Sequence, residues 1–268
     1  MTSPPAPQRF FYGWAIVGAA FAVTLLGFGS AYTFSAFLKP LEQEFGASRG
    51  EVSLVFALAG FLYFALGIVS GPLADRYGAR TMAVLGMFLV GAGLVFAALA
   101  RTITEVYVAY GLGVCIGVGC AYVPAVGAVQ RWFLRRRGFA SGLAVSGIGL
   151  GTLVMPPLAA WLIDLVGWRQ AYITLGLAAA LLGIAMSWLL VNDPRDQGLG
   201  PDGDPLTAAS AGARSGNTVR DAVRSRQFVG LYAASLPCAF GVFLPFVHLV
   251  PYALDLGLPP PPALLLPR

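Results

Sequence analysis

The stretch Gly71–Thr81, GPLADRYGART, is a short polar turn between two long apolar runs. Its two glycines let the backbone reverse between closely packed helices, and its charged residues stand where the apolar runs end. A related stretch, PLAAWLIDLVGWR, occurs at residues 157–169. Both read Pro-Leu-Ala and then Asp-x-x-Gly-x-Arg, and the aspartates Asp75 and Asp164 are 89 residues apart. The spacing predicts an internal repeat, although ordinary turn chemistry between antiparallel helices explains each element separately.

The composition excludes a water-soluble chain. Apolar residues make up 57% of the 268 residues and charged residues only 11%, whereas soluble domains carry about a quarter charged residues. The mean hydropathy is +0.76. The net charge of +5 is spread over short segments, so we expect no nucleic-acid partner. The cysteines Cys115, Cys120 and Cys238 lie in apolar runs as packing residues, and no cofactor or metal site is predicted.

Seven apolar stretches are long enough to cross a bilayer as helices, at about 20 residues each. They cover roughly residues 11–37, 51–73, 81–100, 104–130, 138–163, 169–191 and 228–252. The predicted fold is therefore all-α and integral to the membrane. We expect a cytoplasmic tail, a six-helix bundle of two inverted three-helix repeats, a linker, a seventh helix and an aberrant tail, over residues 1–10, 11–191, 192–226, 227–254 and 255–268.

The linker is rich in Pro, Gly, Asp, Ser and Arg, which predicts a mostly flexible segment. Its end, TVRDAVRSRQF, has the pattern of a short amphipathic surface helix with Thr218 as N-cap.

Positive charge is distributed unevenly between the two sides of the predicted bundle. One side holds the five basic residues Lys39, Arg49, Arg101, Arg169 and Arg268. The side of the N-terminus holds twelve, which are Arg9, Arg76, Arg80, Arg131, Arg135, Arg136, Arg137, Arg195, Arg214, Arg220, Arg224 and Arg226. The bias predicts a multi-pass protein of the inner or plasma membrane with a cytoplasmic N-terminus.

Several motifs resemble the major facilitator superfamily. GPLADRYGART is similar to its loop between helices two and three. FFYGWAIV at 10–17, RWFLRRRGFASGLAVSGIGLG at 131–151, DPRDQGLGPDG at 193–203 and FVHLVPYALDLGL at 246–258 resemble the monocarboxylate porter and oxalate–formate antiporter branch, especially its bacterial members. The resemblance covers residues 10–258 and implies alternating-access transport of small monocarboxylates, coupled to protons or to exchange.

The resemblance also implies that the 71–81 loop braces one conformation against the other half of the fold. Asp75 is expected to pair with Arg80 or to cap a neighbouring helix N-terminus. The alternative for Arg76 is that it is only a solvated turn residue, one of the positive charges that set the orientation in the membrane. The residues expected in this gating motif are Gly71, Asp75, Arg76, Gly78 and Arg80. The spacing of Gly147 and Gly151 predicts close helix packing, because small residues let helix backbones approach in lipid.

Four residues are candidates for the substrate cavity. Tyr32 and Tyr122 lie at mid-helix depth and carry a polar handle; the resemblance places Tyr32 on the transport path, and simple packing is the alternative for both. Arg131 stands one turn before the anchor Arg135–Arg137 and is a candidate to face the cavity. His248, the only histidine, is a candidate for proton coupling, because histidine as a residue type can change its charge near neutral pH, although it lies about one turn from its helix end.

The resemblance further implies a fold of twelve helices, in which basic residues of helices eight and eleven chiefly supply the positive partner of the substrate carboxylate. This sequence stops after seven helices, with Pro259–Pro262 followed by Ala-Leu-Leu-Leu-Pro-Arg. A proline run does not propagate a helix. We therefore expect a frameshift or truncation near Leu258, a missing C-terminal half as partner, and a non-transporting fragment or pseudogene product as the alternative to a carrier.

An enzyme is not expected. Ser146 and His248 stand in the order of an intramembrane serine hydrolase dyad. However, Ala144 replaces the glycine that such a serine motif carries two residues earlier, and the 71–81 loop has no role in that chemistry.

Overall fold

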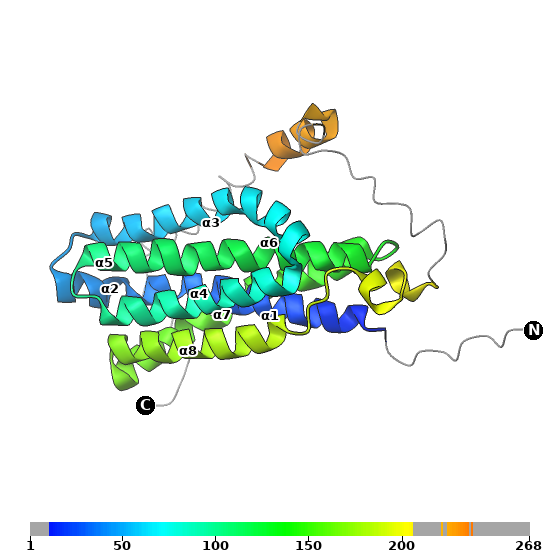
Figure 1. Cartoon of the computed structure of the whole chain (residues 1–268). Helices are drawn as coiled ribbons and strands as arrows, with labels where there is room; N and C mark the ends of the chain where they lie inside the picture. Colours follow the sequence, from blue (N-terminus) through cyan, green and yellow to red (C-terminus); the bar gives the residue numbers. More distant parts are fainter. Residues whose placement is uncertain (1–10, 206–220, 222–223, 236, 238–268) are drawn as a thin grey trace, which may run out of the picture. The chain divides into compact units, whose positions relative to one another are not determined.

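The computed structural model describes residues 11–205, 221, 224–235 and 237. The chain divides into two units, Met1–Thr207 and Ala208–Arg268. The described part of the first unit is a bundle of long helices that lie side by side (Figure 1). The described residues of the second unit are mainly helical. Apart from one isolated bridge between Leu199 and Pro205, these described ranges form no β-structure.

The first unit contains six long helical stretches, some of them interrupted. Five are long and apolar enough to cross a membrane, and α3 is a further helix of 29 residues. The elements are α1 Gly13–Tyr32, α2 Phe34–Phe45, α3 Arg49–Tyr77, α4 Ala79–Leu99, α5 Ile103–Val108, η1 Ala109–Cys115, α6 Ile116–Trp132, α7 Arg137–Val166, α8 Trp168–Ser187, η2 Pro194–Gln197 and η3 Pro201–Gly203. The prediction of an all-α membrane bundle is confirmed.

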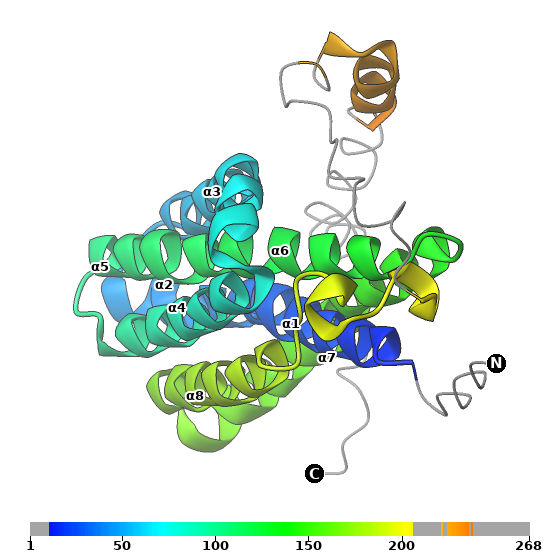
Figure 2. The ribbon, with the colours of Figure 1, turned by 45° about the vertical axis from the view of Figure 1, so that its right-hand side comes forward.

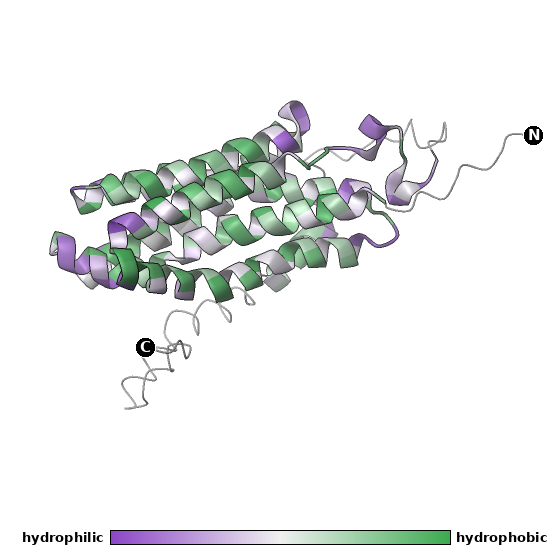
Figure 3. Ribbon diagram, turned by 90° about the horizontal axis from the view of Figure 1, so that it is seen from below, coloured by the Kyte–Doolittle hydropathy of each residue, from purple (hydrophilic) through white to green (hydrophobic). Residues whose placement is uncertain are grey.

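Hydropathy along the bundle follows the expected depth profile. Hydrophobic residues occupy the middle of the helices, and hydrophilic residues gather at the two ends (Figure 3). The first stretch runs from Gly13 to Phe45, beyond the predicted end at residue 37, and it is interrupted at Thr33. The fourth stretch contains the π-helix η1 between α5 and α6.

The two halves of the bundle have equivalent turns. A single glycine joins α3 to α4 and another joins α7 to α8, with φ/ψ of 87°/147° at Gly78 and 80°/160° at Gly167. Positive φ favours glycine, because a Cβ is disfavoured there. The pairing of helices is equivalent as well, because α1 packs on α7, α6 packs on α3, and α4 packs on α8. The predicted 89-residue repeat is therefore present in the backbone.

Small residues bring α1 and α7 into backbone contact. A Cβ built on Gly147 would lie 2.3 Å from the Phe21 carbonyl oxygen. A Cβ on Gly151 would lie 2.5 Å from the Leu25 carbonyl oxygen. Next to Gly147 the Thr24 hydroxyl donates to the Ala144 carbonyl across the interface, at 2.7 Å. The contact is therefore too close for any side chain larger than hydrogen at either glycine.

In the second unit, the described helical run 226–235 follows Ser225, whose Oγ accepts a hydrogen bond from the Phe228 N–H at 3.1 Å. The Phe228 and Tyr232 rings stack with centroids 6.2 Å apart. The predicted N-cap, Thr218, lies outside the described residues, as does most of the predicted seventh span 228–252.

Candidate functional site

The end of the bundle that carries Gly78, called here the Gly78 end, holds an ion-pair network. The guanidinium of Arg131, at the end of α6, donates to the Asp75 carboxylate of α3 and to the Asn192 side chain that follows α8. The expected pair of Asp75 with Arg80 is not formed, because Arg131 reaches the carboxylate from the neighbouring helix. The Asp75 side chain is 66% exposed and that of Arg131 35%, so the pair fixes geometry more than it stabilises the fold.

Arg80 instead caps the chain that leaves α8. Its Nε donates to the Leu190 carbonyl at 3.0 Å, and its guanidinium lies 5.9 Å from the centroid of the Trp188 ring. Gly71, expected to help the chain reverse, instead lies within α3, half-buried next to Val123 of α6, and the reversal occurs at Gly78 alone. Arg76 is exposed over the ring of the adjacent Tyr77.

The opposite end of the bundle, called the Gly167 end, repeats this arrangement with Arg169. One of its nitrogens donates to the carbonyls of Ala98 and Ala100, at 2.8 and 3.0 Å, where α4 ends. Its other nitrogen pairs with Glu44 at 3.0 Å. A guanidinium at a helix C-terminus satisfies free carbonyls and opposes the helix dipole. Arg80 of α4 thus binds the chain that leaves α8, and Arg169 of α8 binds the end of α4.

Residues 191–205, called here the strap, bind the Gly78 end of the bundle (Figure 2). The Asp202 carboxylate accepts the backbone N–H groups of Leu134 and Arg135, at 3.1 and 2.9 Å. Asp204 pairs with the Arg135 guanidinium at 2.6 Å, and the indole N–H of Trp132 donates to the Val191 carbonyl at 2.9 Å. The predicted flexible linker 192–226 therefore begins with a stretch that makes fixed contacts.

Three helices bring aromatic side chains together in the middle of the bundle. The ring of Phe28, on α1, meets Tyr63 of α3 and Tyr122 of α6 edge to face, with centroids 5.4 and 5.1 Å apart. Tyr32 lies one turn beyond Phe28 on α1, and its hydroxyl interacts with that of Tyr63. Tyr32 and Tyr122 are half-buried, whereas Phe28 and Tyr63 are buried. We call these four residues the tyrosine cluster.

The four predicted cavity residues do not all meet. Tyr32 and Tyr122 both belong to the tyrosine cluster. Arg131 lies nine residues beyond Tyr122 on the same helix, about 13 Å along its axis at 1.5 Å per residue, in the network of the Gly78 end. His248 lies outside the described residues. Ser146 donates to the Leu143 carbonyl of its own helix at 2.8 Å, as an ordinary helical serine does.

Sequence reasoning missed Phe28, Tyr63 and Asn192. The spacing of Phe28 and Tyr32 (i, i+4) places both on one face of a helix, so that signal was available. No pattern in the sequence links Tyr63 or Asn192 to its partners, because the contacts arise only when different helices pack.

Comparison with known proteins gives consistent matches. A family model described as Major Facilitator Superfamily matches residues 19–267. Monocarboxylate transporter 11 of Mus musculus is 35% identical over 96% of this chain and 56% of its own length, and the Homo sapiens protein of that name is 31% identical over 96% and 53%. Monocarboxylate transporter 2 of Mesocricetus auratus is 27% identical over 94% and 54%.

Solved structures match the fold. The inward-open xylose transporter XylE from E. coli aligns over 68% of this chain and 49% of its own, with a TM-score of 0.58 and 19% identity. A POT family transporter aligns over 89% and 48%, with a TM-score of 0.57 and 18% identity. The chain therefore spans about half the length of the proteins that it matches.

Proposed function

Because this chain belongs to the major facilitator superfamily, we propose that it is one half of a carrier of small monocarboxylates that works by alternating access. Its relatives are named as monocarboxylate transporters and not as enzymes, so the serine hydrolase has no support. In the proposed mechanism the described bundle rocks as one body against a second bundle, and the substrate binds between the two.

The tyrosine cluster is the observation that carries the proposal. A small monocarboxylate has an anionic head and a short apolar body. Tyrosine hydroxyls donate hydrogen bonds to such a head, and the ring faces contact the body. Tyr32 and Tyr122 keep part of their surface exposed. The apolar stretches 11–37, 51–73 and 104–130, which carry the cluster, contain no lysine or arginine. A cationic partner for the carboxylate is therefore expected from the second bundle.

The network of the Gly78 end supports a rocking bundle. Asp75, Arg131 and Asn192 tie together α3, α6 and the start of the strap. The strap in turn holds the turn between α6 and α7 through Asp202. These contacts join helix ends that would otherwise move separately, so we expect the bundle to move as a unit and the network to brace one conformation.

The finer parts of the proposal follow from the sequence. In this proposal, transport is coupled to protons or proceeds by exchange, and the chain is a bacterial-type member of the monocarboxylate porter and oxalate–formate antiporter branch. The N-terminus is cytoplasmic and the protein lies in the inner or plasma membrane, because basic residues are concentrated at the Gly78 end. The second bundle is a C-terminal half of the same fold, because the chain spans about half the length of the relatives that it matches.

Uptake of radiolabelled L-lactate by proteoliposomes tests the proposal. The chain is reconstituted alone and together with the C-terminal half of the Mus musculus relative, and copurification of the two halves is measured first. We expect uptake by the paired halves, accelerated by an inward proton gradient or by internal formate, and none by the chain alone.

In the paired halves, Tyr122→Ala is expected to reduce uptake about tenfold or more, because a hydrogen bond to a charged group contributes roughly 1.5–3 kcal/mol. Leu181→Ala, at a 69% exposed position on α8, is the control and should leave uptake unchanged. A pair that copurifies and carries no monocarboxylate, or a Tyr122→Ala variant with full uptake, would contradict the proposal.

A further inference from the structure

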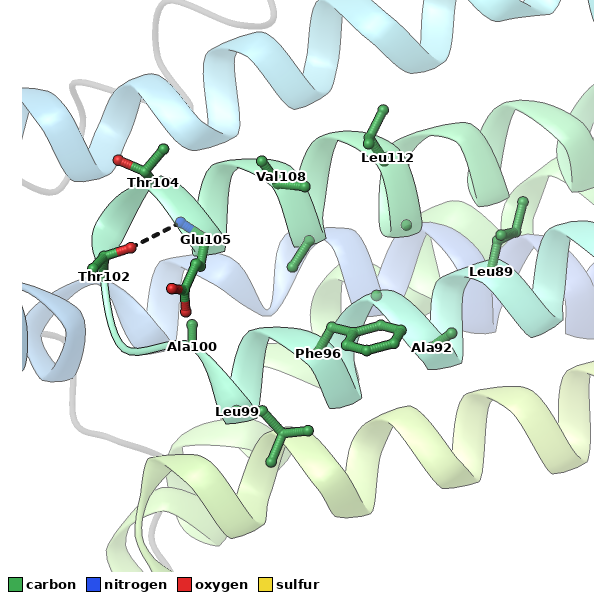
Figure 4. A pocket seen from close by; sticks show the side chains of 13 residues that line it. Leu89, Ala92, Phe96, Leu99, Ala100, Thr102, Thr104, Glu105, Val108 and Leu112 are labelled. Atoms are coloured by element: carbon green, nitrogen blue, oxygen red, sulfur yellow. Dashed lines mark hydrogen bonds between the residues drawn. The ribbon is translucent and has the colours of Figure 1, made fainter.

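An apolar groove of about 760 Å³ runs between α4 and the stretch formed by α5 and η1 (Figure 4). Phe96 on α4 and Val108 and Leu112 on the facing stretch form its sides, and these side chains are 54–65% exposed. The groove lies on helices that are long and apolar enough to cross the membrane. Hydrocarbon chains of lipids are therefore the molecules that surround it.

Glycines give the groove its floor. A Cβ built on Gly113 would lie 2.3 Å from the Gly93 Cα, so the two backbones touch at this level. The floor continues with Ala92 and Ala109, which are also small. The facing wall is the π-helix η1, and such a segment is wider than an α-helix and frequent at functional sites. Two helices in backbone contact, with large side chains only at the edges, leave a continuous channel along the surface.

The polar end of the groove presents an anchored carboxylate. The Thr102 hydroxyl caps α5 by accepting the Glu105 backbone N–H at 3.3 Å, and the Glu105 carboxylate accepts the Arg101 backbone N–H at 2.7 Å. Figure 4 shows Thr102, Thr104 and Glu105 together at this end, with Leu89 and Leu112 toward the other. Glu105 and Arg101 are both exposed, and the bond from the Arg101 backbone to the Glu105 carboxylate makes the acidic and the basic residue neighbours at this end of the groove.

The groove has the length of one leaflet. Ten residues of α4 separate Leu89 from Leu99, both of which line it, and ten residues of α-helix span about 15 Å. Half of a hydrocarbon core of about 30 Å is also about 15 Å. An acyl chain that begins at Glu105 would thus end near the middle of the bilayer.

We propose that this groove binds one acyl chain of a phosphatidylethanolamine-type lipid whose head group docks on Glu105 and Arg101. The ammonium donates hydrogen bonds to the Glu105 carboxylate, and Arg101 pairs with the phosphate. A choline head group carries the same charge but has no N–H to donate, and a glycerol head group carries no cation, so both bind less well. This inference is independent of the transported substrate.

Native mass spectrometry of the full chain tests the site. The protein is purified from nanodiscs that contain equal amounts of phosphatidylethanolamine, phosphatidylcholine and phosphatidylglycerol, and the retained lipids are identified. We expect one lipid to be retained, with phosphatidylethanolamine preferred about fivefold, the ratio that a well-formed exposed ion pair provides. Glu105→Gln keeps an acceptor for the Arg101 N–H and removes the charge, so it should abolish the preference and leave the helix cap intact.

Ala92→Phe, which fills the floor of the groove, should lower retention of all three lipids. Leu181→Phe adds the same ring at an exposed position of α8 outside the groove and should change nothing. Equal retention of the three lipids by the unmodified chain, or an unchanged preference in Glu105→Gln, would overturn the proposal. If Ala92→Phe does not yield monodisperse protein, the Glu105→Gln comparison decides alone.

Discussion

Gly147→Leu and Gly151→Leu are each expected to destabilise the bundle by about 1–3 kcal/mol or more, because overpacking of a close contact costs that much. At both positions a new Cβ would meet backbone oxygens of α1 within 2.5 Å. Backbone cannot move aside as a flexible side chain can, so α1 and α7 must separate. The bond from Thr24 to the Ala144 carbonyl would be lost with the interface. The loss of stability is measured as thermal unfolding in detergent, with size-exclusion chromatography used to monitor the folded fraction after heating.

Gly149→Leu is the matched control for these variants. Gly149 lies on the same helix between the two glycines, and a Cβ there has no heavy atom within 4 Å. Its unfolding temperature should stay close to that of the unmodified chain. Equal destabilisation at residues 147, 149 and 151 would show that helix propensity, and not the α1–α7 contact, determines the effect.

Arg169→Ala is expected to destabilise the Gly167 end by about 2–3 kcal/mol. The substitution leaves the carbonyls of Ala98 and Ala100 without their donor and Glu44 without its partner. Hydrogen bonds to charged groups contribute roughly 1.5–3 kcal/mol each, and the 40% exposure of the Arg169 side chain reduces their sum.

Arg80→Ala removes the equivalent cap at the Gly78 end but only one carbonyl contact, so we expect a smaller loss of about 1 kcal/mol. Arg76→Ala, at an exposed position of the same turn, serves as control and should change stability little. Arg169→Lys should recover part of the loss, because lysine keeps the charge but not the planar fork. An Arg80→Ala variant less stable than Arg169→Ala would contradict the assigned contacts.

The parts of the fold that the sequence predicts are those encoded locally. Helix positions follow from apolar runs of membrane-spanning length, and the repeat follows from the two Asp-x-x-Gly-x-Arg turns, whose glycines adopt the same backbone conformation. The four-residue spacing of Gly147 and Gly151 predicts close helix packing, and both glycines do contact the backbone of α1. Each of these features depends on residues within one helix or one turn.

The features that sequence reasoning missed depend on contacts between elements. Asp75 has Arg80 nearby in sequence, yet it pairs with Arg131, 56 residues away. The strap reads as a flexible linker, because Gly, Pro and Asp are also the residues of tight turns, and it becomes fixed only when Asp202 meets the α6–α7 turn. Tyr63 joins Tyr122 through Phe28 of a third helix. No pattern along one helix predicts such a meeting.

The central claim is that the tyrosine cluster faces the path of a small monocarboxylate, and cysteine accessibility at Tyr122 tests it most directly. Tyr122→Cys is prepared in a chain whose three native cysteines are replaced by alanine, paired with the C-terminal half of the relative, and treated in membranes with an impermeant maleimide. We predict that Cys labelling at this position proceeds from water and is slowed by millimolar L-lactate, whereas Leu181→Cys is not labelled. Labelling that lactate does not change, or no labelling at all, would contradict the account.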